Sequence, residues 1–140
     1  MKINVKQSEG IKPNGLPYRV LIVDDSAFIA KQLAKILTSE GFEVVDTAAN
    51  GAVGVKKYMA LHPTIDLVTM DITMPGTDGV SALEKILEFD KEAKIIMISA
   101  LGTDDMVKKC VLIGAKGYIN KPLDRDKVLL RVVPVLKPDR

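Results

Sequence analysis

The sequence has few of the residues that would place the protein in several large classes. It contains one cysteine, Cys110, which excludes an internal disulfide and fits a reducing compartment. It has no tryptophan, three tyrosines and three phenylalanines, too few for an aromatic platform that stacks nucleic-acid bases. The formal net charge of +2, from 20 basic and 18 acidic residues, also gives no indication of nucleic-acid binding.

Long hydrophobic runs are absent too. No segment approaches the roughly 18 consecutive apolar residues that a membrane span needs, and residues 1–6 lack the apolar core of a signal peptide. We therefore expect no membrane insertion and a soluble, cytoplasmic protein. Hydrophobic residues nevertheless make up 47% of the chain, which is enough to form the core of one domain.

Strand-like and helix-like segments alternate along most of the chain. Apolar runs at residues 20–23, 43–48, 67–70, 95–98 and 117–120 are each followed by a segment with helical periodicity. Five such alternations predict an α/β fold with a doubly wound, five-stranded parallel sheet and helices on both faces. The expected strand order is the flavodoxin-like 2-1-3-4-5.

The domain boundaries follow from the same pattern. Glycines and prolines punctuate residues 1–18 without a periodic apolar face, so we expect a flexible N-terminal extension. The alternation of Ile3 and Val5 leaves a short strand as an alternative. Residues 19–136 would form the single domain and residues 137–140 a tail, with no second module expected.

Polar side chains stand where the apolar runs end. Asp24 and Asp25 follow the first run, Asp71 the third, Ser99 the fourth and Lys121 follows the fifth. Ligands of doubly wound sheets bind at the carboxyl ends of the strands, and the expected order makes the first and third strands neighbours. The three acids would therefore lie together, where they must bind a cation or raise a pKa. A hydroxyl and an ammonium nearby predict a site for Mg²⁺ and a phosphoryl group, with an aspartate as nucleophile.

These motifs, in this order, resemble the receiver domains of two-component response regulators. The resemblance is carried by Asp24-Asp25, residues 71–76 with Asp78-Gly79, Ser99-Ala100 and Lys121-Pro122, and it covers about residues 19–136. The chain resembles a stand-alone receiver, similar to the regulators of chemotaxis. Two adjacent acids alone are a weak motif, but the whole series, each member after the expected strand, is highly specific.

The resemblance implies a metal site and a phosphoacceptor. Asp71 would accept a phosphoryl group from a histidine kinase. Asp24, Asp25, Asp71 and the backbone carbonyl of Thr73 would hold Mg²⁺, for which Mn²⁺ could substitute. The protein would thus be a signalling switch and not an enzyme that turns over external substrates.

The resemblance also implies a conformational response. Ser99 and Lys121 would bind the phosphoryl group, and Tyr118 would turn inward as Ser99 moves. The Lys121-Pro122 peptide bond would be cis. The face formed by the fourth helix, fifth strand and fifth helix would then bind a downstream protein, with the flagellar motor switch as the expected target.

The expected lifetime of the signal depends on two positions that depart from the family pattern. Thr73 and Leu101 lie two residues after Asp71 and Ser99, where the family's side chains flank the water that hydrolyses the acyl phosphate. Leu101 cannot orient that water by hydrogen bonding, and Thr73 can do so only weakly. We therefore expect slow to moderate self-dephosphorylation.

Simpler interpretations stay open for individual residues. Asp24-Asp25 or Ser99 could cap helices, Lys121 could be a surface lysine, and Tyr118 could be a static strand aromatic. His62 is expected to be an ordinary surface residue, and Cys110 is expected to pack as a small apolar side chain.

Other functions also remain as alternatives to chemotaxis. These are a receiver in another phosphorelay or in developmental signalling, and a pseudo-receiver scaffold that binds partners without phosphorylation. A Mg²⁺-dependent phosphohydrolase would need a second acid two residues after its nucleophile, and Thr73 occupies that position.

Overall fold

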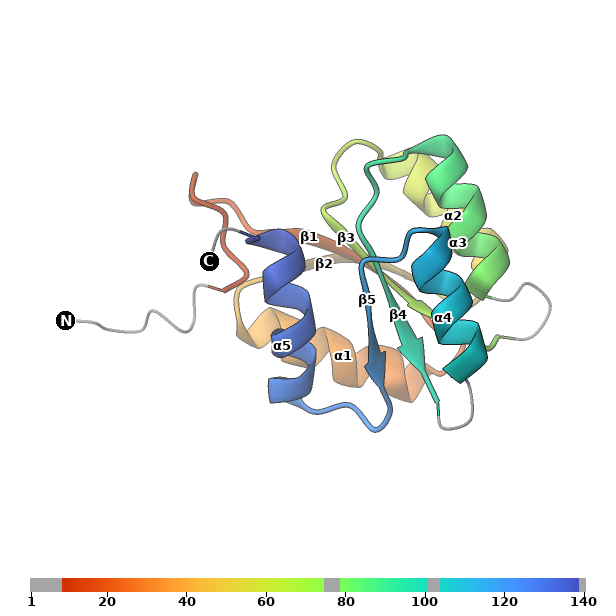
Figure 1. Cartoon of the computed structure of the whole chain (residues 1–140). Helices are drawn as coiled ribbons and strands as arrows, with labels where there is room; N and C mark the ends of the chain where they lie inside the picture. Colours follow the sequence, from red (N-terminus) through yellow and green to blue (C-terminus); the bar gives the residue numbers. More distant parts are fainter. Residues whose placement is uncertain (1–8, 75–78, 101–103, 139–140) are drawn as a thin grey trace.

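The computed structural model describes residues 9–74, 79–100 and 104–138 (Figure 1). Its strands are β1 (Arg19–Val23), β2 (Glu43–Ala48), β3 (Leu67–Asp71), β4 (Ile95–Ser99) and β5 (Gly117–Asn120). Its helices are α1 (Ala27–Ser39), α2 (Gly51–Leu61), α3 (Gly79–Phe89), α4 (Asp104–Ile113) and α5 (Arg125–Leu136). The strands are parallel and lie in the order β2-β1-β3-β4-β5, which confirms the predicted topology.

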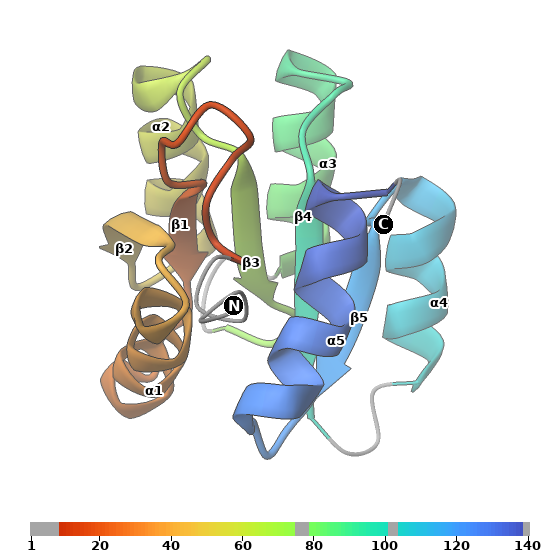
Figure 2. The same ribbon diagram turned by 90° about the vertical axis from the view of Figure 1, so that its left-hand side faces the viewer.

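Helices cover both faces of the sheet, α1 and α5 on one face and α2, α3 and α4 on the other (Figures 1 and 2). Two hydrophobic clusters result, one under each helical layer. Successive side chains of a strand point to opposite faces, so within β4 Ile96 and Ile98 pack toward α1 and α5 while Ile95 and Met97 pack toward the other layer. This double burial explains why the central strands are apolar without alternation.

The register of the sheet aligns the carboxyl ends of the inner strands. Val23 of β1 pairs with Met70 of β3, and Ser99 of β4 pairs with Asn120 of β5. The residue that follows each paired strand end is therefore delivered to the same edge of the sheet. This edge is where the predicted site residues were expected.

Side-chain caps fix where three helices begin. Ser26, Asn50 and Asp124 each accept a hydrogen bond from the backbone N–H three residues later, at the start of α1, α2 and α5 respectively. The segment around Asn50 thus caps a helix. Gly41, just after α1, has a φ of 93°, a left-handed conformation that favours glycine at helix ends.

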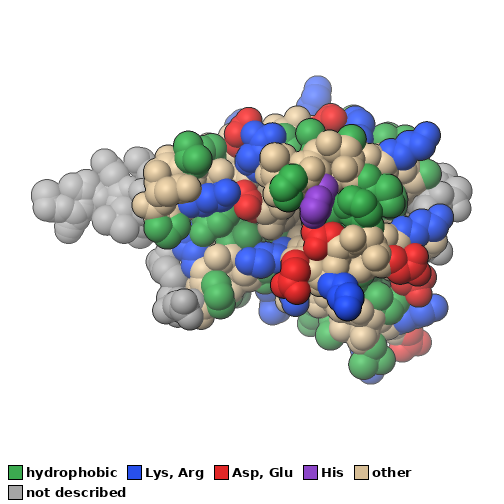
Figure 3. Space-filling model, turned by 90° about the horizontal axis from the view of Figure 1, so that it is seen from above, with side chains coloured by type: hydrophobic (Ala, Val, Ile, Leu, Met, Phe, Trp, Pro, Cys, Tyr) green, Lys and Arg blue, Asp and Glu red, His purple; other side chains and the backbone are tan. Residues whose placement is uncertain are grey.

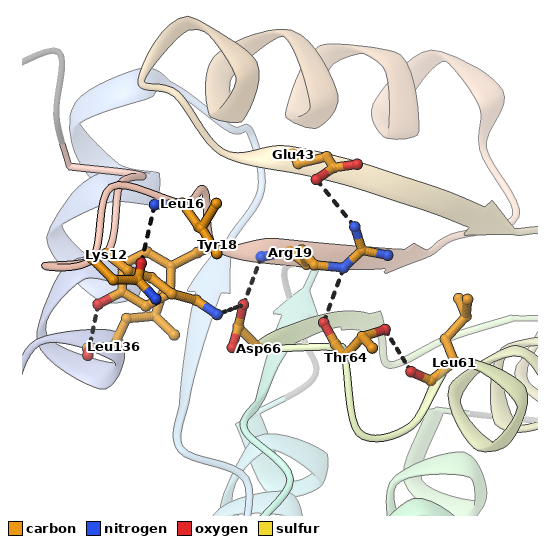
Figure 4. Close-up of polar contacts among 10 residues, drawn as sticks. Lys12, Leu16, Tyr18, Arg19, Glu43, Leu61, Thr64, Asp66 and Leu136 are labelled. Carbon is orange, nitrogen blue, oxygen red and sulfur yellow. Dashed lines mark hydrogen bonds and ion pairs between the residues drawn. The ribbon is translucent and has the colours of Figure 1, made fainter.

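Residues 9–18 form a strap across the amino end of the sheet. The Gly10 N–H donates to the carbonyl oxygen of Glu40 at 2.9 Å, and Tyr18 is buried with its hydroxyl 3.4 Å from the Leu136 carbonyl oxygen (Figure 4). A Cβ on Gly10 would lie 2.3 Å from the backbone nitrogen of Phe42, so the strap has no space for a side chain there. The sequence did not indicate these contacts, because glycines and prolines alone predicted only a flexible extension.

Some expectations concern residues that are not described. The short strand proposed around Ile3 and Val5 falls on residues 1–8, which lie outside the described residues. Within the described ranges, no helix is both long enough and apolar enough to cross a membrane.

Candidate functional site

Three carboxylates converge at the carboxyl end of the sheet. Each of Asp24, Asp25 and Asp71 offers an oxygen atom within 4.8 Å of the others. Asp24 follows β1 and Asp71 ends β3, and the pairing of these neighbouring strands sets the two side by side. Asp24 and Asp71 are 5% and 4% exposed, whereas Asp25 faces solvent. The structure thus brings together the three acids that the sequence singled out.

Backbone donors orient the buried carboxylates. Asp24 Oδ1 accepts a hydrogen bond from the Ser26 N–H at 2.8 Å, and Asp71 Oδ1 accepts one from the Thr73 N–H at 3.3 Å. Among the described residues, Asp24 Oδ2 is buried without any hydrogen-bond partner. Because Ser26 is the residue that caps α1, helix capping does not account for Asp24 and Asp25.

The electrostatics of the cluster oppose ionisation. Burial, followed by the negative charge of Asp24, raises the pKa of Asp71 to about 6, although the Lys121 ammonium acts in the opposite direction. Burial also raises the pKa of Asp24, against the hydrogen bond from Ser26 and the charge of Lys121. The carboxylates of Asp24 and Asp71 therefore lie close together, and the charge of Lys121 and the backbone hydrogen bonds do not fully offset their burial and mutual repulsion.

A divalent cation fits this donor set. The site offers three convergent carboxylate oxygens and a buried oxygen without a protein donor, and oxygen donors of this kind suit Mg²⁺. A cation would also offset the negative charge of Asp24, which after burial is the next cause of the raised pKa of Asp71. Asp24, Asp25 and Asp71 are the residues that would hold it.

Lys121 approaches the cluster from β5. Its Nζ atom lies 3.6 Å from Asp71 Oδ2, and its side chain is 25% exposed. The Lys121-Pro122 peptide bond that follows β5 is cis, as is His62-Pro63. Lys121 is therefore not simply a surface lysine, because its ammonium faces the buried carboxylate of Asp71.

Gly79, the first residue of α3, packs against the backbone of Asp71. Its N–H donates to the Ile72 carbonyl oxygen at 2.8 Å. A Cβ at this position would lie 2.1 Å from the Asp71 carbonyl oxygen, so any side chain would push α3 away from the end of β3. Glycine is thus required here for close approach.

Ser99 ends β4 in a buried position with a specific partner. Its hydroxyl donates to Asn120 Oδ1 at 2.6 Å, and the side chain is 1% exposed. Ser99 precedes the first residue of α4 by five positions, so its hydroxyl does not cap that helix. The sequence reasoning missed Asn120, although the expected adjacency of the fourth and fifth strands could have paired it with Ser99.

A hollow of about 650 Å³ lies beside the site, between α4 and β5. Its lining includes Val107, Leu112, Tyr118 and Asn120. The ring of Tyr118 is half-buried and is covered by the Arg131 guanidinium of α5, 5.2 Å from the ring centroid. Tyr118 therefore has space on one side and a cationic contact on the other.

The remaining candidate residues are separate from this site or outside the described ranges. Cys110 is buried in α4, as expected. The imidazole of His62 lies 3.4 Å from Asp90 Oδ2 at the opposite end of the sheet. Leu101 and the turn at residues 75–78 lie outside the described residues.

Comparison with known proteins gives a consistent result. Residues 20–133 match the family described as response regulator receiver domain. The chain is 64% identical over 135 residues to a chemotaxis protein CheY of Treponema pallidum, covering 96% of this chain and 94% of that one. It is 50% identical over 114 residues to CheY of Bacillus subtilis, covering 81% and 93%.

Among solved structures, a similar chain comes from the CheX–CheY–BeF₃–Mg²⁺ complex of Borrelia burgdorferi. It superimposes with a TM-score of 0.89 and 56% sequence identity, covering 92% of this chain and 97% of that one.

Proposed function

Since the chain belongs to the response regulator receiver domain family and is a CheY-like receiver, we propose that it is a chemotaxis switch phosphorylated on Asp71. The observation that carries the proposal is the contact of this buried acid with both Asp24 and Lys121 at one edge of the sheet. A histidine kinase is the phosphodonor, and the protein acts in the cytoplasm. The relatives named CheY favour chemotaxis over another phosphorelay.

In the proposed reaction, an Asp71 carboxylate oxygen attacks the phosphorus of a phosphohistidine. The new P–O bond forms as the P–N bond breaks, and the imidazole leaves with the bonding electron pair and takes up a proton. Lys121, already 3.6 Å from Asp71, pairs with the transferred group. Ser99 donates its hydroxyl proton to a phosphoryl oxygen.

Asp24, Asp25 and Asp71, with the Thr73 backbone carbonyl, are proposed to hold Mg²⁺, with Mn²⁺ as a substitute. When bound, the ion neutralises negative charge on the transferring phosphoryl group. Attack requires Asp71 to be ionised, and burial together with the negative charge of Asp24 disfavours that form. The same acids that raise the pKa of Asp71 in the free protein thus become its metal site.

The output of the switch is proposed to be altered protein binding. Movement of Ser99 toward the phosphoryl group opens space into which Tyr118 turns, which reshapes the α4–β5–α5 face. The hollow between α4 and β5, with Leu112 87% exposed beside it, supplies a surface for a downstream protein such as the flagellar motor switch. A CheX-like protein is a second proposed partner, because the Borrelia relative forms a complex with CheX.

We also propose that the acyl phosphate is lost slowly to moderately by self-hydrolysis, because Leu101 cannot orient a water molecule. The decay of the phosphorylated protein with Mg²⁺ present would be followed by mass spectrometry. A decay rate that neither Leu101→Ala nor Thr73→Ala changes would contradict this assignment.

One experiment tests the main proposal. The protein would be incubated with Mg²⁺ and acetyl phosphate, or with Mg²⁺ and beryllofluoride, and followed by intact mass and by amide chemical shifts. We expect a single phosphoryl adduct with acetyl phosphate, shifts around Asp71 and Tyr118 with beryllofluoride, and loss of both in Asp71→Asn. Asp90→Asn, at the opposite end of the sheet, is the matched control and should react like the wild type.

The alternatives predict different results. No adduct and no shift in the wild type would indicate a phosphorylation-independent scaffold. Repeated turnover of varied phosphomonoesters would indicate a phosphohydrolase. Either result would overturn the switch.

A further inference from the structure

The hydroxyl of Ser99 is already engaged in the free protein. It has one proton to donate, and the Asn120 carboxamide oxygen accepts it at 2.6 Å, a short distance for such a bond. The Ile119 carbonyl oxygen, at 3.4 Å, is a much weaker acceptor. Ser99 therefore cannot donate to a phosphoryl oxygen on Asp71 without giving up the bond to Asn120.

The sheet builds this contact into the fold. Ser99 and Asn120 are register partners in the parallel β4–β5 pair, which places their side chains next to each other. Alternation along β5 puts Asn120 on the same face as Tyr118, and both residues line the hollow between α4 and β5. Asn120 thus joins the buried hydroxyl of Ser99 to the space around Tyr118.

We propose that Asn120 is a positioning residue that restrains Ser99 in the resting state and so sets how readily the switch responds to phosphorylation. The inference rests on the proposed function, because it assigns to Asn120 a competition with the phosphoryl group for one proton. A hydrogen bond to a charged phosphoryl oxygen is stronger than one to a neutral amide, so phosphorylation wins that competition. The hydrogen bond to Asn120 nevertheless reduces the free energy gained when Ser99 binds the phosphoryl group, because that bond has to be broken first.

The test is the apparent affinity for beryllofluoride with saturating Mg²⁺, measured from amide shifts of the full chain. The loss of one neutral hydrogen bond from the resting state should tighten beryllofluoride binding in Asn120→Ala by about 2- to 10-fold. Asn120 is solvent-exposed, so the variant should fold, and Asn120→Leu is a second variant of similar side-chain size. Asp90→Asn, at the opposite end of the sheet, is the control, and this variant should bind beryllofluoride with the affinity of the wild type.

A second arm separates restraint of Ser99 from a general structural effect. In a Ser99→Ala background the competition is absent, so adding Asn120→Ala should leave the affinity for beryllofluoride unchanged. Equal or weaker binding by Asn120→Ala alone, or the same tightening in the Ser99→Ala background, would overturn the role of Asn120 while leaving the switch intact. A wild-type protein that does not respond to beryllofluoride would instead overturn the proposed function itself.

Discussion

Carboxylates at the two ends of the sheet differ in how fully their oxygen atoms are hydrogen-bonded by the protein. At the amino end, Asp66 accepts a hydrogen bond from the Arg19 N–H at 2.8 Å and pairs with Lys12 at 3.1 Å (Figure 4). Asp90 accepts a hydrogen bond from the Tyr58 hydroxyl at 2.6 Å. At the carboxyl end, Asp24 keeps a buried oxygen that no described residue contacts with a hydrogen bond.

The surroundings of the amino end reinforce this difference. The imidazole of His62 packs against the ring of Phe89, with 5.1 Å between the ring centroids, and both contact Tyr58. The space-filling view of this end shows the single histidine among hydrophobic and acidic side chains (Figure 3). Asp66 and Asp90 thus have partners within the protein, whereas Asp24 keeps an oxygen atom that is open to the proposed metal ion. A structural cluster of acids differs from a binding site mainly in whether the carboxylate oxygens already have hydrogen-bond partners in the protein.

The largest expected effect concerns the metal. Asp25→Asn removes an exposed carboxylate from the cluster of three and should raise the Mg²⁺ concentration for half-saturation by about 10- to 100-fold, as loss of groups that support a metal site does. The measurement is a Mg²⁺ titration followed by amide shifts. Asp66→Asn, at the amino end, should leave the titration unchanged. If the two variants behaved alike, the distinction between the two ends would fail.

A smaller effect concerns stability and pH. The folded protein binds a proton on Asp71 more tightly than the unfolded chain does, because its pKa is raised to about 6. Without metal, the free energy of unfolding should therefore fall as pH rises from about 4 to about 6, and stay low above that range. Asp71→Asn removes this cost and should be more stable than the wild type by about 1–2 kcal/mol at pH 7.5.

Urea unfolding in EDTA at pH 4.5 and pH 7.5 would measure this difference. The gain from Asp71→Asn should shrink at the lower pH, where the wild-type carboxyl is already protonated. Saturating Mg²⁺ should also reverse the order of stability at pH 7.5, because only the wild type has the full set of ligands. Equal stability of the two proteins at both pH values would argue that the buried charges carry no cost.

The smallest effect is expected at the amino end. Tyr58→Phe deletes the hydroxyl that donates to Asp90 and should lower the free energy of unfolding by about 1 kcal/mol. Urea unfolding at pH 7.5 tests this, with the Mg²⁺ titration of the same variant as the control that should not change. Stabilisation by Tyr58→Phe would contradict a stabilising role for the hydrogen bond between Tyr58 and Asp90.

The sequence predicted the fold and the convergence of Asp24 and Asp71 well, because both follow from the hydrophobic pattern and from the strand order that it implies. Apolar runs ending in acids, together with the strand order of a doubly wound sheet, were enough to place Asp24 beside Asp71. The bond from Ser99 to Asn120 and the packing of Arg131 on Tyr118 were not predicted. They depend on strand register and on side-chain geometry across neighbouring elements, which hydrophobic periodicity does not contain.

The strap was missed for a related reason. Besides hydrogen bonds within the strap itself, residues 9–18 contact segments far away in the sequence, namely the end of α1, the start of β2, the loop before β3 and the end of α5. Composition describes their lack of periodicity but not their partners. A segment rich in glycine and proline can therefore be well packed when tertiary contacts supply its hydrogen bonds.

The strap also has a practical consequence for following this protein in cells. Glu9 lies 3.5 Å from Lys137, so the described parts of the chain begin and end beside each other. This meeting point is at the amino end of the sheet, across the molecule from Asp71. A fluorescent reporter attached next to Glu9 or Lys137 would thus be tethered from the side opposite the proposed phosphorylation site, and a linker joining these two positions would suit circular permutation.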